Sequence, residues 1–265
     1  MTLQDTIHLR YYQPVNYNCL KKRYWLEQVE RVEKTRKQID ERLSTTAGRV
    51  LPTESDLSIG TGRRMNMAVM FLDICRFSSR PSESQNEQEF ILASLNLFFS
   101  EMIKIAEDYK GQVEKNTGDG LMAYFEDGGS DPPENGTHRA VACSLTMMAA
   151  GKHLINSVLI NSRIPEIQFR ICIDYGNVTV AKLGAPRRFN SIVAIGTSAN
   201  IASKMLAHAG GGDILIGDAA KKQLPIDWQS RFTTLQTIDS GWNYRQSKLP
   251  YFFYRYTGRW AKLFD

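Results

Sequence analysis

The order of the apolar segments constrains the fold of this chain more than any other feature of its sequence. A run at residues 65–72 that is apolar except for Asn66 predicts a buried strand, and residues 87–109 carry apolar side chains at helical spacing. Short strand-like segments at 111–115 and 121–125 flank Gly118-Asp119-Gly120, whose glycines suit a tight hairpin turn. A second helical segment, 137–155, precedes residues 167–173, which alternate apolar and polar side chains like a half-buried strand.

This β-α-β-β-α-β order predicts an α+β fold with a ferredoxin-like core and added strands, preceded by an N-terminal helix. The added elements include a hairpin turn at Gly176-Asn177 and a C-terminal meander that ends at residues 251–256. The others are strands at 178–183, 191–195 and 213–216 and a helix at 197–208.

The segment before this core is predicted to form a helix over residues 18–47. Its apolar residues recur like a short heptad seam, and eight Lys/Arg against five Asp/Glu between Cys19 and Ser44 give it a charge of +3. Packing on its own domain, a dimer contact and an anion-binding face are all open, and packing is favoured. The seam residues are Trp25, Val29, Val32, Ile39 and Leu43.

Glycine and proline in a polar stretch at residues 47–63 are typical of a linker. We therefore expect an N-terminal helical segment and linker over residues 1–60, a folded domain over 61–258 and a tail over 259–265. A chain of 265 residues with 42% hydrophobic residues is long enough to bury one sizeable core.

Charge and apolar runs limit the partners and the compartment. A net charge of +5 favours anionic ligands, but both signs are mixed along the chain, so we expect no nucleic-acid partner. No apolar run reaches the ~18 residues of a membrane span, and the N-terminus lacks the apolar core of a signal peptide. Four scattered cysteines without a CxxC pair indicate reduced thiols, so a cytoplasmic protein is predicted.

Two aspartates stand at positions where chemistry is expected. Asp73 ends the first core strand, and Asp119 lies at the tip of the hairpin that should pair beside it. Two carboxylates a few ångströms apart repel each other unless they share a cation. Mg²⁺ or Mn²⁺, with oxygen ligands and substrate phosphates, is the usual occupant of such a pair.

Four motifs carry a resemblance to a known family. They are Phe-x-Asp-Ile-x-x-Phe-Ser at 71–78, Lys-x-x-Gly-Asp at 115–119, Arg-x-x-Ile-x-x-Gly-x-Val at 170–178 and Gly-x-x-x-Asn-x-x-x-Lys at 196–204. In order and spacing, they resemble the class III nucleotidyl cyclases over residues 64–257. The resemblance implies a head-to-tail homodimer whose active sites lie at the interface.

The same resemblance implies which residues act. Asp73, Asp119 and the backbone carbonyl of Ile74 would hold two divalent metal ions, Mn²⁺ or Mg²⁺, while the other chain would contribute Asn200 at the ribose and Lys204 at the polyphosphate. The ribose 3′-hydroxyl of a nucleoside triphosphate would attack the α-phosphorus, and pyrophosphate would leave.

The sequence departs from the family pattern at Lys204 and at Arg76. Lys204 stands where the family usually has arginine, so the charge is kept and the planar fork is lost. Arg76 stands where many relatives have glycine and would add a cation beside the metal carboxylates. Phe77, from the first motif, is assigned to substrate binding. Arg245 or Lys248 would match a family lysine that contacts phosphates, with a solvated surface charge as the alternative for each.

Base recognition rests on two positions. Lys115 matches the lysine with which purine-specific relatives read adenine, but their aspartate is replaced by Val193. Valine cannot accept a hydrogen bond from the amino group of adenine or cytosine, whereas Lys115 can donate to uracil O4 or guanine O6.

The layout of a basic helix directly before a cyclase domain resembles the bacterial Pycsar pyrimidine cyclases. That resemblance implies UTP as substrate and cyclic UMP as a second messenger in anti-phage defence, read by a downstream effector. An adenylate, guanylate or cytidylate cyclase and a catalytically inactive dimerisation module remain as alternatives.

Overall fold

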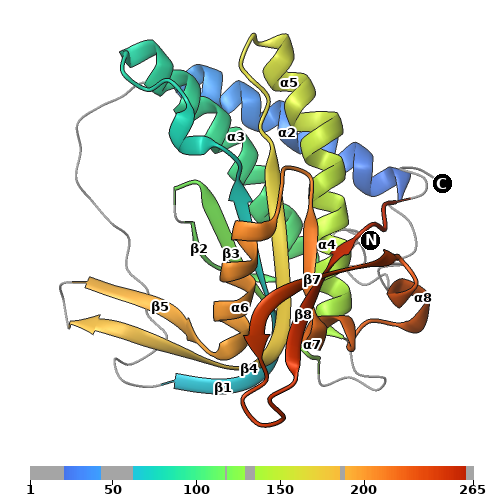
Figure 1. The fold of residues 1–265 in the computed structure, drawn as a ribbon. Coiled ribbons are helices and arrows are strands. Elements are labelled where there is room, and N and C mark those ends of the chain that lie inside the picture. Colours follow the sequence, from blue (N-terminus) through green and yellow to red (C-terminus); the bar gives the residue numbers. More distant parts are fainter. Residues whose placement is uncertain (1–20, 43–61, 117, 129–134, 186–188, 261–265) are drawn as a thin grey trace, which may run out of the picture.

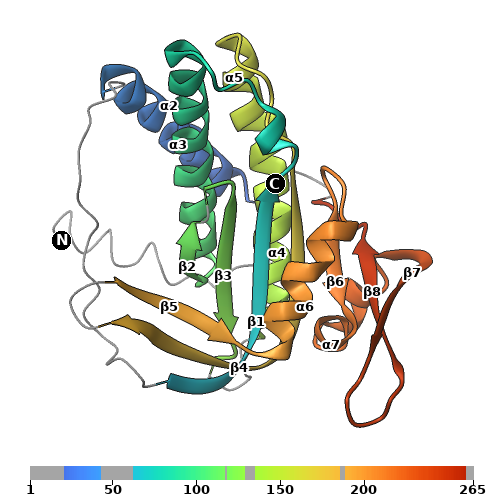
Figure 2. The same cartoon turned by 60° about the vertical axis from the view of Figure 1, so that its left-hand side comes forward.

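The computed structural model describes residues 21–42, 62–116, 118–128, 135–185 and 189–260. One sheet with the order β2-β3-β1-β4-β6-β8-β7, with β5 paired to β4, runs through these residues, and helices cover both of its faces (Figures 1 and 2). Among the described helices, none is long and apolar enough to cross a membrane.

The strands are β1 (Gly62–Ile74), β2 (Gln112–Asn116), β3 (Gly120–Glu126), β4 (Phe169–Ala185), β5 (Phe189–Ile195), β6 (Ile214–Gly217), β7 (Phe232–Asn243) and β8 (Pro250–Tyr256). The α-helices are α2 (Lys22–Arg42), α3 (Gln85–Asp108), α4 (Gly136–Ala150), α5 (Asn156–Asn161), α6 (Thr197–Met205), α7 (Asp218–Lys221) and α8 (Ile226–Gln229). A π-helical turn, Gly151–Ile155, joins α4 to α5, and 3₁₀ turns cover Phe77–Ser79 and Leu206–His208.

The predicted ferredoxin-like core is confirmed, with β1 between β3 and β4 and β2 outside β3. Side chains alternate along β1 with the period of two that a pleated strand imposes. Ala68, Met70 and Leu72 lie in the main core with residues of α3 and α4. Met67 and Val69 lie in a second cluster with Ala199 of α6, so α6 covers the opposite face of the sheet.

The predicted hairpin turn at Gly176-Asn177 is wrong, because β4 continues through both residues. Asn177 pairs with Asn66 and Gly176 with Met67 on β1. The glycine serves close packing instead of a turn: a Cβ at position 176 would lie 3.3 Å from Oγ of Ser198 on α6. The chain reverses further on, between β4 and β5, which pair antiparallel from Thr179 onwards.

The helix predicted at 137–155 runs from Gly136 to Asn161 and is interrupted by the π-helical turn. Gly151 starts that turn, and a Cβ there would lie 2.5 Å from the ring of Phe169 on β4. A glycine is therefore needed for the helix to approach the strand so closely. α3 begins two residues earlier than predicted, because Ser84 and Glu87 form a capping box at its first turn.

The N-terminal helix packs on its own domain, as the favoured interpretation predicted. α2 lies beside α3 (Figure 2). The side chains of Trp25 and Val32 on α2 are buried. Of the predicted seam, the side chain of Ile39 and the whole of Leu43 lie outside the described residues. The dimer-contact alternative for this helix stays a prediction.

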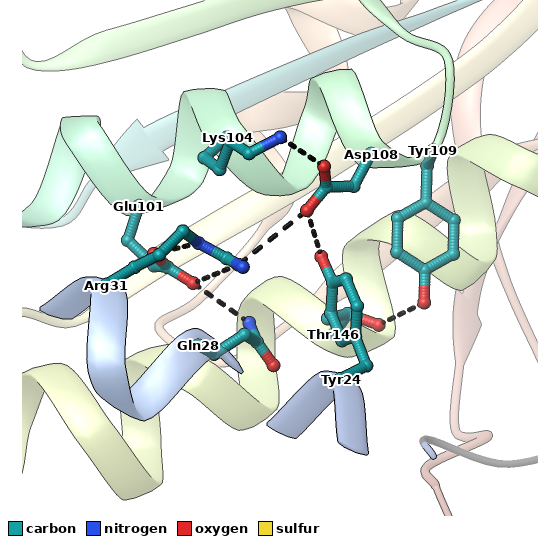
Figure 3. Close-up of polar contacts among 8 residues, drawn as sticks. All are labelled: Tyr24, Gln28, Arg31, Glu101, Lys104, Asp108, Tyr109 and Thr146. Atoms are coloured by element: carbon teal, nitrogen blue, oxygen red, sulfur yellow. Dashed lines mark hydrogen bonds and ion pairs between the residues drawn. The ribbon is translucent and has the colours of Figure 1, made fainter. Parts of the chain in front are cut away.

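A buried polar network fixes α2 to α3 (Figure 3). Glu101 of α3, only 4% exposed, accepts hydrogen bonds from Gln28 Nε2 at 3.1 Å and from Arg31 Nη2 at 3.0 Å. The hydroxyl of Tyr24 donates to Asp108 Oδ2 at 2.8 Å. Burial raises the pKa of Glu101, and the adjacent Arg31 opposes that rise. The Glu101 carboxylate is withdrawn from water, and these hydrogen bonds to it form only when α2 and α3 pack in this arrangement.

We expect Glu101→Ala to lower the free energy of unfolding by about 2 kcal/mol, because it leaves the buried Gln28 amide and the Arg31 guanidinium without their main acceptor. Glu27→Ala is the matched control, since Glu27 pairs with Arg23 on the exposed face of α2, and it should cost less than about 0.5 kcal/mol. Urea unfolding measures both. Equal midpoints for the two variants would contradict the role given to this network.

Candidate functional site

The two aspartates meet where β1 ends. Asp73 pairs with Gly120, the residue directly after Asp119, and the backbone N–H of Ile74 donates to the carbonyl of Asp119 at 2.9 Å. Gly118 has a φ of 95°, which supports the turn that returns the chain into β3. Both aspartate side chains are partly exposed. The predicted convergence of Asp73 with Asp119 is therefore present in the backbone register.

Arg170, at the start of the neighbouring strand β4, forms an ion pair with Asp73. Its Nη2 lies 2.6 Å and its Nε 2.8 Å from Asp73 Oδ2, and its Nη1 donates to the carbonyl of Ala209 at 3.0 Å. Arg170 belongs to the third of the four motifs, but no role was predicted for it. Its role follows from the β1–β4 register, which places Arg170 directly opposite Asp73 and which no local sequence pattern reveals.

The donor set at this end of β1 suits a hard divalent cation. Asp73 and Asp119 offer carboxylate oxygens, and Ile74 adds a backbone carbonyl. In the described part of the chain, no group of three or more His, Cys, Asp or Glu side chains gathers as a metal site. Mg²⁺ commonly binds through one or two carboxylates plus water and substrate phosphates. The two carboxylates of Asp73 and Asp119 match this ligand set. Burial raises the pKa of the adjacent Cys75 thiol, which keeps that thiol protonated and a poor ligand.

Arg76 and Phe77 follow directly in the chain. Arg76 is exposed and adopts a left-handed backbone, with φ 55° and ψ 30°, at the start of the 3₁₀ turn. Glycine occupies that conformation without strain, whereas a residue with a Cβ, such as Arg76, is strained there. The ring of Phe77 is half-buried and packs against the main core. Contact of either residue with a substrate stays a prediction.

Asn200 and Lys204 lie on α6, four residues apart, and both are exposed. Their spacing places them on one helix face, as predicted. The ammonium of Lys204 lies 6.0 Å from the ring centroid of Trp242 on β7. A cation within this distance of an aromatic face is weakly attracted to it.

Within one chain, Asn200 does not lie beside the aspartate pair. Arg170, which holds Asp73, reaches Ala209 beyond the end of α6. Asn200 lies near the start of α6, and the rest of that helix and the 3₁₀ turn Leu206–His208 separate it from Ala209. The two predicted halves of the site are therefore separated along the same face of the sheet.

The two residues predicted to read the base lie on different strands. Lys115 pairs with Met122 where β2 meets β3, and Val193 pairs with Ala181 where β5 meets β4. The side chains of Lys115 and Val193 lie outside the described residues, so their approach to a base stays a prediction.

Arg245 and Lys248 lie exposed in the turn between β7 and β8. Lys248 has a φ of 60°, and its N–H donates to the carbonyl of Tyr244 at 2.9 Å, which shapes the turn. The Tyr244 hydroxyl donates to Asp218 Oδ2 at 2.6 Å, which ties the turn to α7. Phosphate contact and a solvated charge both stay open for Arg245 and Lys248.

A buried carboxyl group anchors the root of the same hairpin. Asp174 of β4 is 1% exposed and accepts a hydrogen bond from the Tyr251 hydroxyl of β8 at 2.5 Å. Burial raises the pKa of Asp174 to about 7, although the hydrogen bond from Tyr251 opposes the rise. Sequence reasoning missed Asp174. A charged residue within the buried run of a strand was the available signal.

We expect Asp174→Asn to flatten the dependence of stability on pH. The folded-state pKa of about 7 lies above the unfolded value of about 3.9, so this carboxyl group stabilises the fold fully below about pH 4. That stabilisation falls as the pH rises, by about 1.4 kcal/mol per unit, until about pH 7. Urea unfolding at pH 5 and pH 7 should show a smaller loss in Asp174→Asn than in the wild type, by about 2 kcal/mol.

Glu107→Gln, which removes an exposed carboxylate of α3, is the control for this measurement and should keep the wild-type profile. An unchanged pH profile in Asp174→Asn would show that Asp174 is ionised in the folded protein throughout this range.

Residues 60–246 match the family described as the adenylate and guanylate cyclase catalytic domain. The chain belongs to this family. An adenylate cyclase of Anabaena cylindrica is 29% identical over 173 residues, which are 64% of this chain and 33% of that protein. The chain thus spans about a third of the length of this curated relative.

Solved cyclase structures share the fold of this cyclase domain. The guanylyl cyclase Cya2 superposes with a TM-score of 0.62 at 20% identity, covering 75% of this chain and 94% of that one. The adenylyl cyclase CyaB from P. aeruginosa gives 0.57 at 24% identity, covering 75% and 96%. The class III cyclase fold expected from the four motifs is therefore confirmed.

Proposed function

We propose that this protein is a nucleotidyl cyclase that converts a nucleoside triphosphate, UTP by preference, to its 3′,5′-cyclic monophosphate and pyrophosphate. One observation carries the proposal: the register of β1 and β3 brings Asp73 beside Asp119 at a partly exposed strand end. Membership of the cyclase family supports the same activity.

Asp73 and Asp119 would hold the divalent metal ions, with the Ile74 carbonyl as a further ligand. Bound there, Mg²⁺ or Mn²⁺ would lower the pKa of the attacking hydroxyl and neutralise charge that grows on the phosphates. Arg170 would act as a positioning residue, because its bonds to Asp73 Oδ2 fix the orientation of that carboxylate. The other oxygen, Asp73 Oδ1, would thereby have a fixed orientation before any ligand binds.

The remaining contacts would come from a second copy of the chain. Asn200 lies near the start of α6, whereas Arg170 and Asp73 lie near Ala209, beyond the end of that helix. The ribose hydroxyl has to meet the α-phosphate at the metal ions, so we assign the ribose contact to Asn200 of a second chain. In a head-to-tail homodimer, Asn200 would orient the ribose, and Lys204 would pair with the polyphosphate. Arg76 and either Arg245 or Lys248 would add cations for the phosphates.

The preference for UTP rests on the residues at the two base-reading positions. Lys115 can donate to a carbonyl oxygen, whereas Val193 offers no acceptor to an exocyclic amino group. An amino group left unsatisfied in a closed pocket costs about 1–3 kcal/mol, which disfavours ATP and CTP. The likeness to the Pycsar cyclases extends this proposal to a cyclic UMP signal that a separate effector reads during phage infection.

Purified protein incubated with each of the four nucleoside triphosphates and Mn²⁺ should yield cyclic UMP as the main product, resolved by liquid chromatography. Asp73→Asn and Asp119→Asn should each lower product formation at least about 100-fold, because each weakens metal binding worth several kcal/mol. Asp227→Asn, at an exposed carboxylate of α8, is the matched control and should keep full activity.

Each other outcome of this assay has a definite meaning. Cyclisation of ATP alone would refute the role given to Val193, and cyclic GMP as the main product would leave Lys115 in place but refute UTP. No pyrophosphate release with any nucleotide would favour an inactive dimerisation module.

Mixing Asp73→Asn protein with Asn200→Ala protein should restore activity to about a quarter of the wild-type value. Random exchange of subunits makes half of the dimers mixed, and each mixed dimer holds one intact site of two. A mixture of Asp73→Asn with Asp119→Asn is the matched control: both changes fall in the same half-site, so it should stay inactive. Absence of rescue in the first mixture would refute a site shared between chains.

A further inference from the structure

A cavity of about 510 Å³ lies behind the start of β4, on the side of the sheet that α4 covers. The end of α4, the π-helical turn, the segment before β4, the Gly211-Gly212 turn and the pair Arg259-Trp260 form its walls. Its volume falls within the range of small-molecule sites, about 300–1,000 Å³. Neither Asp73 nor Asp119 lines it, so this cavity is distinct from the aspartate pair.

The walls combine an apolar floor with a polar rim. Met148, Ala149, Ile167 and Phe169 contribute apolar surface, and the Trp260 indole is held by a bond from its Nε1 to Thr146 Oγ1 at 3.1 Å. An indole fixed in this way presents a flat apolar surface at little entropic cost.

The charged groups of the rim are predominantly basic. Lys152 and Arg259 are the cations among the lining side chains, and Glu166 is the one acidic residue among them. Gln168 Nε2 donates to Glu166 Oε1 at 3.3 Å, so part of that carboxylate is engaged within the wall. The rim is therefore complementary to a negative charge.

The cavity arises from irregular backbone at two places. The π-helical turn adds a residue to the helix, and such turns often occur at functional sites. Across the cavity, the turn at Gly211 lies close to the Gln168 side chain, since a Cβ at position 211 would be 2.9 Å from Gln168 Oε1. The π-helical turn and the Gly211 turn both line this cavity.

The strand segment that lines the cavity also holds the aspartate site. The Gln168 carbonyl accepts from the N–H of Cys75 at 2.8 Å, two residues after Asp73. Phe169 lines the cavity, and the next residue, Arg170, forms the ion pair with Asp73. On the far wall, Arg259 Nη2 donates to the Gly212 carbonyl at 3.2 Å, and the Gly212 N–H donates to that of Phe169 at 2.8 Å.

We propose that this cavity binds a small organic carboxylate with a flat apolar body, and that its occupancy alters the activity at Asp73 through the Gln168–Arg170 segment. The apolar body lies against Trp260 and Met148, and the carboxylate pairs with Lys152 at the rim. The regulatory half of this statement rests on the proposed cyclase function, whereas the binding half does not.

The binding half is tested by calorimetric titration of the full chain with 1-naphthoate, and with neutral 1-naphthamide as the matched probe. Naphthoate should bind with one site per chain and roughly tenfold more tightly than the amide, because only naphthoate gains the ion pair. Lys152→Glu should weaken naphthoate binding roughly tenfold or more and leave the amide unchanged.

Two further variants locate the site. Ala149→Trp fills the cavity and should abolish binding of both probes. Lys34→Glu, which reverses an exposed charge on α2, should bind naphthoate like the wild type. Lys152 is exposed, so Lys152→Glu keeps the test valid if the larger side chain at position 149 prevents folding. No binding to the wild type, or equal binding to the wild type and Lys152→Glu, overturns the proposal.

The regulatory half is read from product formation at saturating nucleotide, with and without naphthoate. The rate should change at least twofold in the wild type and in Lys34→Glu, and should not change in Lys152→Glu. Binding without a change in rate refutes the coupling and leaves the site. Binding to an enzyme that is inactive with every nucleotide refutes the proposed cyclase function and the coupling but supports the site.

Discussion

The pairing of β1 with both of its neighbours is the constraint on which the rest of this structure depends. One register sets Asp73 opposite Gly120 on β3 and opposite Arg170 on β4. A slip of one residue on β1 would turn Asp73 toward the other face of the sheet. It would also exchange the apolar side chains that β1 buries on its two faces, so that each set would meet packing partners shaped for the other. The packing of ordinary hydrophobic residues thus fixes the position of a chemical group.

The sequence predicted those parts of the fold that depend on local pattern. The core strands and helices were found because their apolar periodicity is local, and the aspartate pair followed from the order of the elements. The mistaken turn at Gly176-Asn177 has a physical cause. A glycine that allows a turn and a glycine that allows Ser198 to approach look the same until the partner helix is known.

Roles that depend on burial or pairing were out of reach of the sequence alone. Arg170 acquires its partner only through the β1–β4 register, and Asp174 becomes unusual only because Tyr251 and the surrounding core withdraw it from water. The interruption of the α4–α5 helix is a similar case. Its π-helical turn depends on how Gly151 meets Phe169, which helical periodicity does not encode.

The docking of α2 has a practical consequence for anyone who shortens this protein. A version that started at β1 would match the family boundary but would uncover the carboxylate of Glu101 and the apolar surface that Trp25 and Val32 cover. Exposed apolar surface promotes self-association. The Glu101 carboxylate beside it would also lose its hydrogen-bond partners on α2. Fragments prepared for crystallisation should therefore begin before Lys22, even though the cyclase core starts some forty residues later.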